Sequence, residues 1–437
     1  MPFITKNDLT MLSTKKLRFL LVLLFVSLVF STGAKASSVS IRDLQNEINL
    51  LKQRIGEIED KKTSSLSPDL QGVDVFGSVR IQLLKHNNDG SAFGALGGDV
   101  AASRLPNLQG TNLRLGAIKR ISDMTKFVFE LYMDKEDGVK FRSIYFTFDL
   151  TDHTLFTFGQ QYIDNFAYYG LDNIDRSSLP NNVRFERMAD LFPDRAMGVS
   201  FAHLYDRAGI YYGIYGNAIE DSTTEKNQVI ANAKAYFVPA QGDNGLIHLG
   251  LSNFYKNEEF KRALLVQDVP SRQFTFDMRH LNKSSVELGV LYNNFMFLSE
   301  YDRARIEPTA LREAFYVDSY YLQGSLVLTG ESYLYQYGKF KRFEVANPFN
   351  KGGLGAFEVA YRFANTDGFD KRGVNTFDYG KYVEHVASLN WSATDNFTIL
   401  LSHSFVKETF ESAGMAVVNG GRLNRYEITQ LDVRIFF

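Results

Sequence analysis

The last seven residues of the chain read LDVRIFF (431–437), and they alternate strictly between two kinds of side chain. Neighbouring side chains of a β-strand point to opposite faces. One face therefore collects the apolar residues at 431, 433, 435 and 437, and the other face collects Asp432 and Arg434. An apolar face opposite a charged face is the pattern of a strand that lies between lipid and water.

The same alternation extends upstream to about Gln71. It recurs in VDVFGSVRIQLL (73–84), KFVFELYMD (126–134), VELGVLY (286–292) and FEVAYRF (357–363). We count 16 to 18 such segments, because residues 320–337 read as either one long strand or two. For 16 strands, each strand has about 23 residues, which fits a tilted span of about 9–11 residues plus a connection.

Lipid accepts a sheet only when it closes into a barrel, because every backbone polar group needs a partner there. The alternative, a soluble β-sandwich, would need only about 100 residues for its strands. The sequence therefore predicts an all-β fold: a transmembrane antiparallel β-barrel at residues 71–437, with 16 strands or with 18.

The composition fits this fold class. Hydrophobic residues make up 45% and aromatic residues 14% of the chain, and the mean hydropathy is −0.19. This average is too polar for a helical membrane protein, but it suits strands that give only every second residue to lipid. Cysteine is absent, which excludes a disulfide framework.

Residues 1–36 have the pattern of an export signal. Lys15, Lys16 and Arg18 precede an apolar run at 19–30, and Ala34-Lys35-Ala36 supplies the small residues of a cleavage site. A retained membrane anchor is the alternative, although a spanning helix needs about 20 apolar residues. The start codon is Met1 or Met11. This segment has five basic residues and one acidic residue, so its removal changes the net charge from −2 to −6. An acidic chain argues against a nucleic-acid partner.

Residues 37–63 carry a heptad pattern. Its apolar positions, spaced alternately by three and four residues, are Ile41, Leu44, Ile48, Leu51, Ile55 and Ile58. This pattern predicts a short α-helical coiled coil in the periplasm that drives oligomerisation, with a linker at 64–70 before the barrel. The heptad rule alone favours a coiled coil of two helices. An amphipathic helix packed on a core is one alternative, and a tether that binds peptidoglycan or another periplasmic partner is a second.

Several segments resemble the phosphate-selective porin O/P family. They are LTGESYLYQYGKFKRFEV (328–345), GGLGAFEVAYRFANTD (352–367), VASLNWSATDNFTI (386–399), FTFGQQY (156–162) and DRAMGVSF (194–201). The resemblance implies a 16-stranded barrel in the outer membrane of a Gram-negative cell, assembled as a homotrimer. The terminal Phe437 resembles the signature that the outer-membrane assembly machinery reads. An even strand number places both termini in the periplasm.

The third external connection is expected at 162–195 and is far longer than a usual hairpin loop. In porins the corresponding loop folds inward, and we expect it to form the pore constriction. Its candidate residues are Asp175, Arg176, Arg184, Glu186, Arg187 and Arg195. The arginines either hold anions through paired donors or form ion pairs with neighbouring carboxylates. On the barrel wall, the alternation assigns the charged residues Arg80, Lys126, Glu130, Glu358, Arg362, Asp432 and Arg434 to the lumen.

We therefore predict a porin that allows passive diffusion of ions and small hydrophilic solutes, with a possible preference for anions or phosphate. Catalytic motifs such as G-x-S-x-G, H-E-x-x-H and the P-loop are absent, and no two histidines stand at metal-ligand spacing. No enzyme activity, metal or cofactor is expected, although calcium or lipopolysaccharide could bind acidic loops. The remaining partners are outer-membrane lipid and small anions. A hydrolase at the barrel rim, with residues such as His403 and Ser404, is the least favoured alternative.

Overall fold

The computed structural model describes residues 73–88, 107–134, 138–163, 195–219, 228–262, 276–308, 314–370, 377–409 and 423–437. The chain divides after Gln71, and its second unit, Gly72–Phe437, is a β-barrel. The predicted signal, coiled coil and linker at 1–70 lie outside the described residues, so the coiled coil and its heptad positions stay predictions.

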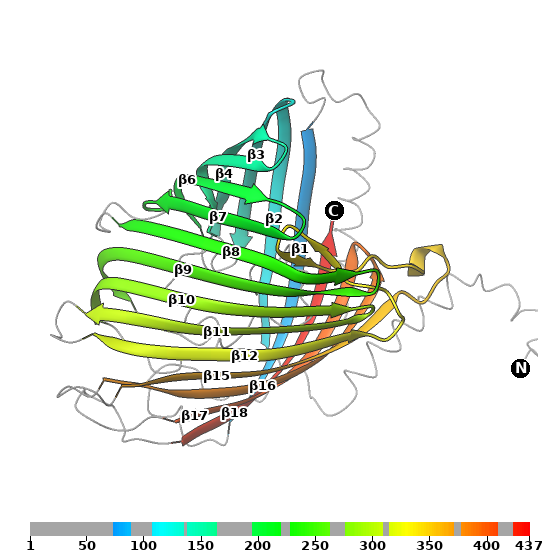
Figure 1. Ribbon diagram of the computed structural model, residues 1–437. Helices are drawn as coiled ribbons and strands as arrows, with labels where there is room; N and C mark the ends of the chain where they lie inside the picture. The colour runs from blue at the N-terminus through cyan, green and yellow to red at the C-terminus, as the bar shows by residue number, and fades with distance from the viewer. Residues whose placement is uncertain are drawn as a thin grey trace, which may run out of the picture. The chain divides into compact units, whose positions relative to one another are not determined.

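Sixteen strands close into the barrel (Figure 1), and every neighbouring pair is antiparallel. The first half comprises β1 (Val73–Asn88), β2 (Asn107–Ser122), β3 (Thr125–Asp134), β4 (Gly138–Thr151), β5 (Thr154–Tyr162), β6 (Arg195–Leu204), β7 (Ala208–Tyr215) and β8 (Val229–Gly242). The second half comprises β9 (Gly245–Arg262), β10 (Phe276–Tyr292), β11 (Phe295–Pro308), β12 (Phe315–Val327), β15 (Ala356–Asp370), β16 (Phe377–Thr394), β17 (Phe397–Thr409) and β18 (Leu423–Phe436). The prediction of a 16-stranded barrel is confirmed.

The barrel has two unlike ends. At one end, called the turn end here, most strands are joined by tight turns such as 123–124 and 293–294. At the other, called the loop end, the longest connection runs from 163 to 194 between β5 and β6. The barrel closes where β1 pairs with β18, and the backbone of Phe437 pairs with that of Gly77 at the turn end (N to O, 2.8 and 3.1 Å).

Exposure on the strands is the reverse of that in a soluble protein. Large apolar side chains such as Leu251 and Ile214, each 62% exposed, lie on the outer face. Charged side chains such as Lys283 and Asp432 are buried on the inner face. A soluble barrel would place these groups the other way round, so the outer face is built for lipid and the inner face for polar groups.

Among the described residues, no helix is long and apolar enough to cross a bilayer.

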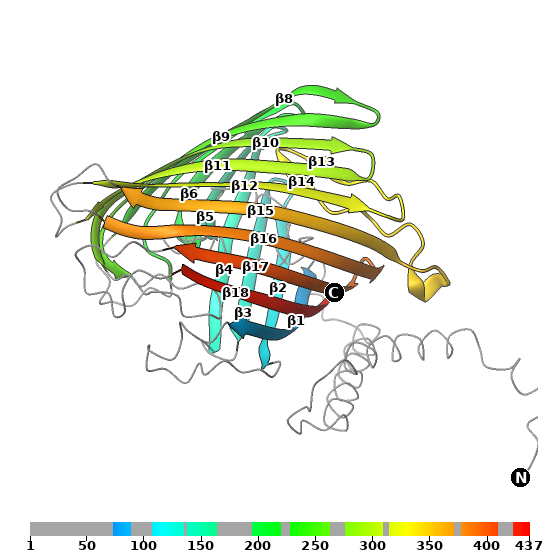
Figure 2. The same cartoon turned by 90° about the horizontal axis from the view of Figure 1, so that it is seen from below.

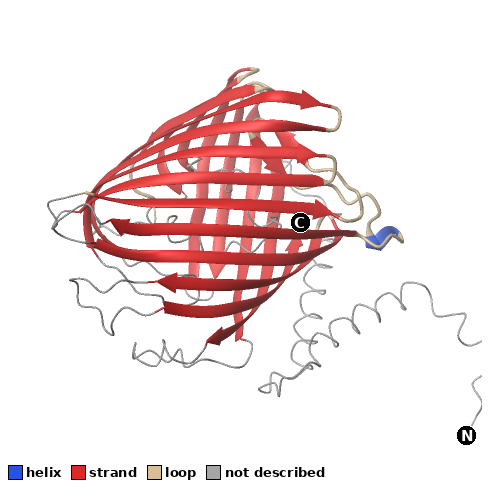
Figure 3. Cartoon of the chain, turned by 60° about the horizontal axis from the view of Figure 1, so that its bottom comes forward, coloured by secondary structure: helices blue, strands red, loops and turns tan. Residues whose placement is uncertain are grey.

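One connection at the turn end is much longer than the tight turns. Between β12 and β15, residues 328–355 form a separate two-stranded hairpin of β13 (Leu334–Gln336) and β14 (Lys339–Lys341), followed by a short 3₁₀ turn, η3 (Phe349–Lys351). The hairpin is labelled beside the barrel strands in Figure 2, and η3 is the blue turn in Figure 3. The ambiguous segment at 320–337 is thus the end of β12 followed by the first strand of an insertion.

Candidate functional site: the inner face of the barrel

The buried charges of the inner face are balanced. Twelve charged side chains are buried among the described residues, six basic and six acidic. The basic residues are Arg80, Lys234, Lys256, Lys283, Arg362 and Arg434, and the acidic residues are Glu287, Glu300, Asp302, Glu358, Glu384 and Asp432. Because a buried charge is costly unless it is paired, their positions relative to one another decide what the wall can offer to a solute.

The first group lies where β1 meets β18. Arg80 and Arg434 stand directly opposite each other in the ladder. Both guanidinium groups reach the same carboxylate oxygen, Oδ2 of Asp432, at 2.8 and 2.7 Å. Gln430 donates to the other oxygen of Asp432 at 2.8 Å. One buried carboxylate therefore holds two arginines together.

The second group spans β8 to β11 and is rich in carboxylates. Lys283 Nζ lies 3.3 Å from Asp302 and 4.0 Å from Glu300. Lys234 Nζ lies 3.1 Å from Glu287, and Glu287 stands opposite Glu300 in the β10–β11 ladder. Lys283 is thus committed to carboxylates on the neighbouring strand β11, and Lys234 to a carboxylate on β10, two strands away.

A third group lies on β15 and β16. Arg362 Nη2 lies 3.6 Å from Glu384 Oε2. Glu358 accepts hydrogen bonds from the hydroxyl of Tyr333 and from Asn390 Nδ2, the latter at 3.1 Å. Across the three groups, most of the buried basic side chains lie against carboxylates, so this part of the wall has little net charge to attract either ion.

A surplus of positive charge occurs on β2 to β6. Arg142 Nε lies 3.5 Å and Arg195 Nη2 3.9 Å from the carboxylate of Glu130. Arg114 and Arg142 also lie against the ring of Tyr132, with 5.8 and 5.5 Å from each Cζ to the ring centroid. We call Arg114, Arg142 and Arg195 the arginine cluster. Two of its arginines reach the carboxylate of Glu130 and the third lies against Tyr132, and these side chains are only partly buried.

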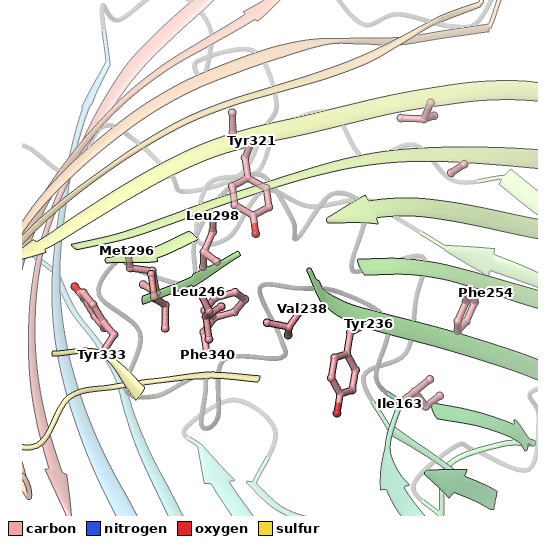
Figure 4. Packing of buried hydrophobic residues seen from close by; sticks show 14 of the residues in the cluster. Ile163, Tyr236, Val238, Leu246, Phe254, Met296, Leu298, Tyr321, Tyr333 and Phe340 are labelled. Atoms are coloured by element: carbon pink, nitrogen blue, oxygen red, sulfur yellow. The ribbon is translucent and has the colours of Figure 1, made fainter. Parts of the chain in front are cut away.

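The hairpin β13–β14 packs against an apolar part of the inner wall near the turn end. Its residue Phe340 lies with the wall residues Leu246, Val238, Met296 and Leu298 in one buried cluster (Figure 4). Such apolar side chains face inward, where a barrel wall in contact with water would be polar. The hairpin covers them, which removes about 1.5–3 kcal/mol of unfavourable exposure for each large side chain.

Two glycines permit this packing. Gly338 follows Tyr337 in the hairpin turn, with φ values of 78° and 50°, and a Cβ on Gly338 would lie 2.6 Å from the ring of Tyr236 on the wall. A Cβ on Gly289 of β10 would lie only 2.1 Å from Cζ of Phe340. At both positions, therefore, the hairpin and the wall lie closer together than a residue with a Cβ atom would allow.

Polar contacts hold the hairpin to the same wall. Tyr211 of β7 donates a hydrogen bond to the carbonyl oxygen of Tyr337 at 2.7 Å. The hydroxyl of Tyr335 lies 2.8 Å from Nδ1 of His248. Burial raises the pKa of the Tyr335 hydroxyl, and the nearby Tyr236 and Glu287 raise it further. Tyr335 therefore stays neutral in the docked hairpin.

The sequence-predicted wall residues lie as follows. Arg80, Glu358, Arg362 and Arg434 are buried in the groups described above. Glu130 belongs with the arginine cluster, and Lys126 Nζ lies 3.4 Å from Asp149 Oδ2, with about a third of its side chain exposed. Apart from Asp432, which shares β18 with Arg434, the partners of these residues come from other strands or from the inserted connection, so they depend on the fold and were not available from the alternation alone.

The predicted third connection has the expected bounds, because β5 ends at Tyr162 and β6 begins at Arg195. Of its constriction candidates only Arg195 is described, where it contacts Glu130 and donates from Nε to Ser143 Oγ at 3.2 Å. The others lie outside the described residues: Asp175, Arg176, Arg184, Glu186 and Arg187.

The remaining candidates are also placed. Phe437 is 50% exposed, with its ring against Gly77. His403 and Ser404 are successive residues of β17, so they point to opposite faces. His403 contacts Thr429 (Nδ1 to Oγ1, 2.9 Å) and Ser404 is buried, so the structure does not bring them together. Within the described residues, no group of three histidine or carboxylate side chains is arranged to hold a metal ion.

Sequence reasoning missed the inward hairpin and its contacts with His248. A signal was present: inward positions on β9 to β11 are apolar at Leu246, Leu291, Met296 and Leu298, where a wetted wall would be polar. Such a patch needs an internal cover, and the only long connection at the turn end among the described residues supplies it.

Solved structures of the same architecture include an outer membrane protein and a porin. An anion-selective porin from Comamonas acidovorans is 13% identical (TM-score 0.51; 84% of this chain and 99% of that chain covered). OmpT, an outer membrane protein of Vibrio cholerae, is 12% identical (TM-score 0.51; 84% and 97% covered). OprB of Pseudomonas putida is 9% identical (TM-score 0.53; 84% and 96% covered). At these identities the likeness concerns the fold alone.

The curated proteins contain no match to this sequence. The family model described as phosphate-selective porin O and P matches residues 111–423, which is well over half of the chain. This match includes most of the barrel strands, the arginine cluster and the hairpin. The chain therefore belongs to the phosphate-selective porin O and P family.

Proposed function

We propose that this porin conducts ions and small hydrophilic solutes by passive diffusion, with a modest preference for anions and without tight binding of phosphate. The observation that carries the proposal is the distribution of inner-face charge. Its buried part is balanced, six basic against six acidic residues, whereas the partly buried arginine cluster has a surplus of positive charge around Glu130.

Selection in a pore depends on charges presented at close quarters. A filter that binds phosphate tightly uses several guanidinium or ammonium donors in series, each available to the anion. On this wall Arg80 and Arg434 share Asp432, and Lys283 lies between Asp302 and Glu300. Such pairing supports a general channel, in which the arginine cluster biases the current toward anions.

The constriction residues of the third connection remain part of the proposal. Asp175, Arg176, Arg184, Glu186 and Arg187 would narrow the lumen, together with Arg195 at the end of the same connection. Their charges are mixed, which again favours weak selection over a dedicated phosphate site.

The test is single-channel conductance in planar bilayers, with the reversal potential measured under a KCl gradient and then with added phosphate. We expect a small anion preference that falls in Arg142→Gln/Arg195→Gln. The matched control is Arg303→Gln on β11, whose side chain is 45% exposed on the outer face. A cation preference of the unsubstituted channel would contradict the proposal. So would phosphate block that disappears on changing Arg184 or Arg187 to alanine, because it would show a selective site in the loop.

We further propose that the turn end faces the periplasm of a Gram-negative cell and that the protein is a homotrimer. The export signal and the coiled coil that the sequence predicts at 1–36 and 37–63 support this arrangement, because the first and last barrel strands both meet the turn end. Lipopolysaccharide and outer-membrane lipid would then contact the outer face.

Truncation before Gln71 tests the role of the coiled coil. If it aligns the subunits, the truncated porin should form a trimer that dissociates at lower temperature in semi-native electrophoresis, while conductance persists. If it tethers the barrel to peptidoglycan, truncation should instead loosen the outer membrane, seen as vesicle release, without a change in the trimer.

A further inference from the structure

Three basic side chains lie on the outer face of the neighbouring strands β16, β17 and β18 (Figure 2). They are Lys381, Lys407 and Arg425, and each lies near the loop end of its strand. Lys407 and Arg425 are exposed, and 45% of the Lys381 side chain is exposed. These cations therefore belong to the outer surface of the barrel and not to the lumen.

The register of the sheet brings the three cations together. Lys407 stands directly opposite Arg425 in the β17–β18 ladder. On the other side of Lys407 stands Val383 of β16, and Lys381 is the next residue of β16 on the same face. Opposite residues have Cβ atoms about 5 Å apart, and diagonal neighbours about 7–8 Å. The ends of three long, flexible side chains can therefore meet on one anionic group.

The pair of Lys407 and Arg425 is unfavourable without an anion, because like charges directly opposite each other destabilise an antiparallel ladder. In the described part of the chain, no carboxylate lies within 4.0 Å of either side chain. The carboxylates nearby are in exposed pairs of their own, Asp367 at 4.0 Å from Lys381 and Glu427 at 3.9 Å from His403. A bound anion would offset the repulsion.

The height of the three cations on the barrel places them at the edge of the apolar band. β17 begins at Phe397 at the turn end and continues through Lys407 to the loop end. The strand between these two residues is about 33 Å long, which for a tilt of about 40° gives about 25 Å along the barrel axis. The apolar band of an outer-membrane barrel is also about 25 Å tall.

An aromatic row on the turn-end side of the cations marks the same boundary. His385 of β16 stands opposite Phe363 of β15 and opposite Phe405 of β17. The rings of His385 and Phe363 have centroids 5.1 Å apart, and Phe405 is 53% exposed. Aromatic girdles of this kind flank the apolar band. The cations just beyond the row therefore lie at the level of lipid head groups.

We infer that Lys381, Lys407 and Arg425 bind the phosphate groups of an anionic lipid in the leaflet at the loop end. In the orientation proposed above this lipid is lipopolysaccharide, so the inference rests on the proposed function and assigns a site to that partner. The guanidinium group supplies paired donors to a phosphate, and the two ammonium groups supply point charges. A lipid is favoured over free phosphate because the aromatic row offers its acyl chains a contact beside the cations.

The experiment measures binding of fluorescently labelled, short-chain lipopolysaccharide to the porin in detergent by fluorescence anisotropy. In Lys407→Gln/Arg425→Gln we expect Kd to rise about thirtyfold, which is about fivefold for each cation near an anionic lipid. The matched control is Lys119→Gln/Arg207→Gln, which removes two exposed cations near the turn end and should leave Kd unchanged. Lys407→Arg/Arg425→Lys keeps both charges and should retain most of the affinity.

Two further arms distinguish the lipid from free phosphate. Lipopolysaccharide without its phosphate groups should bind the unsubstituted porin as weakly as the intact lipid binds Lys407→Gln/Arg425→Gln. Millimolar inorganic phosphate should displace the intact lipid no better than chloride at equal ionic strength, which controls for screening. Displacement by phosphate alone would assign the site to the free ion and overturn the inference.

The outcomes also separate this inference from the proposed function. Heat-modified electrophoresis checks that each variant is folded, and conductance is measured in phosphatidylcholine bilayers, which contain no anionic lipid. If the unsubstituted protein forms no channel there, the proposed function fails, whatever lipid the protein binds. If it conducts but Lys407→Gln/Arg425→Gln binds lipopolysaccharide as tightly, or the turn-end control loses as much affinity, the inference is overturned while the channel function stands.

Discussion

The hydroxyl of Tyr335 on the hairpin lies 2.8 Å from Nδ1 of His248 on β9. The other ring nitrogen of His248, Nε2, lies 3.5 Å from Oε2 of Glu287, whose Oε1 is 3.1 Å from Lys234. One histidine ring thus joins the hairpin to a buried ion pair of the wall. The hairpin is positioned by wall chemistry as well as by apolar packing, which makes its position sensitive to defined substitutions.

The first prediction concerns high pH. Burial raises the pKa of Tyr335 above its ordinary value of 10.0. Because the docked hydroxyl is harder to ionise than the undocked one, its neutral form stabilises the docked hairpin in full below pH 10. This contribution is lost as the pH rises above 10 and through the raised pKa. We expect single-channel conductance to be steady between about pH 7 and 9 and to become larger and noisier above about pH 10.

Tyr335→Phe is the control for this prediction, because it removes the ionising group while keeping the ring. Its docking should be weaker by about 1 kcal/mol, the net value of one hydrogen bond, and its conductance should lack the Tyr335 component of the alkaline rise. An alkaline rise of equal size in both proteins would show that other groups cause it.

The second prediction concerns the closest contact between hairpin and wall. In Gly289→Ala, the added Cβ would lie 2.1 Å from Cζ of Phe340, so the hairpin must shift. Overpacking of this kind costs about 1–3 kcal/mol. We expect larger current fluctuations and a changed mean conductance in planar bilayers.

Gly324→Ala on β12 is the matched substitution, because its Cβ would meet only Phe295, at an ordinary contact distance of 3.8 Å. It should leave the channel record unchanged and the barrel at least as stable, since alanine is favoured over glycine in a strand. Indistinguishable records from the two variants would show that the hairpin position does not control the current.

The third prediction concerns barrel closure. Asp432→Asn leaves Arg80 and Arg434 buried and opposite each other without the carboxylate that both contact. Removing one partner of a buried ion pair costs about 3–5 kcal/mol. We expect a clear drop in the urea midpoint of unfolding from lipid vesicles, measured by tryptophan fluorescence or by heat-modified electrophoresis.

Asp367→Asn serves as the comparison, because Asp367 is 42% exposed and lies 4.0 Å from Lys381 in an exposed pair. Exposed pairs contribute about 0–1 kcal/mol, so its midpoint should barely move. Equal effects of the two substitutions would mean that the shared carboxylate of Asp432 does not stabilise the closure.

Much of the barrel could be predicted from the sequence because alternation records which face meets lipid. The bounds of the third connection followed at Tyr162 and Arg195, since a strand pattern ends where a long polar stretch begins. Ion-pair partners on different strands could not be predicted, because the contact between Arg80 and Asp432 joins residues 352 positions apart and depends on the sheet register. The inward hairpin could not be predicted for another reason. Its alternating pattern equals that of a lipid-facing strand, and only the apolar inner patch that it covers shows that it turns inward.

The last prediction concerns the terminal Phe437. Its ring is 50% exposed, and its backbone pairs with Gly77 whatever the side chain. Phe437→Ala should therefore cost only about 1–2 kcal/mol of stability after refolding in detergent. If the assembly machinery reads this residue, the amount of porin in the outer membrane should fall far more than that loss explains. Phe405→Ala is the matched control, because Phe405 on β17 is 53% exposed on the outer face. If Phe437→Ala and Phe405→Ala have equal refolded stability and reach equal levels in the outer membrane, the assembly machinery does not recognise Phe437. Its side chain would then serve only the structure of the barrel closure.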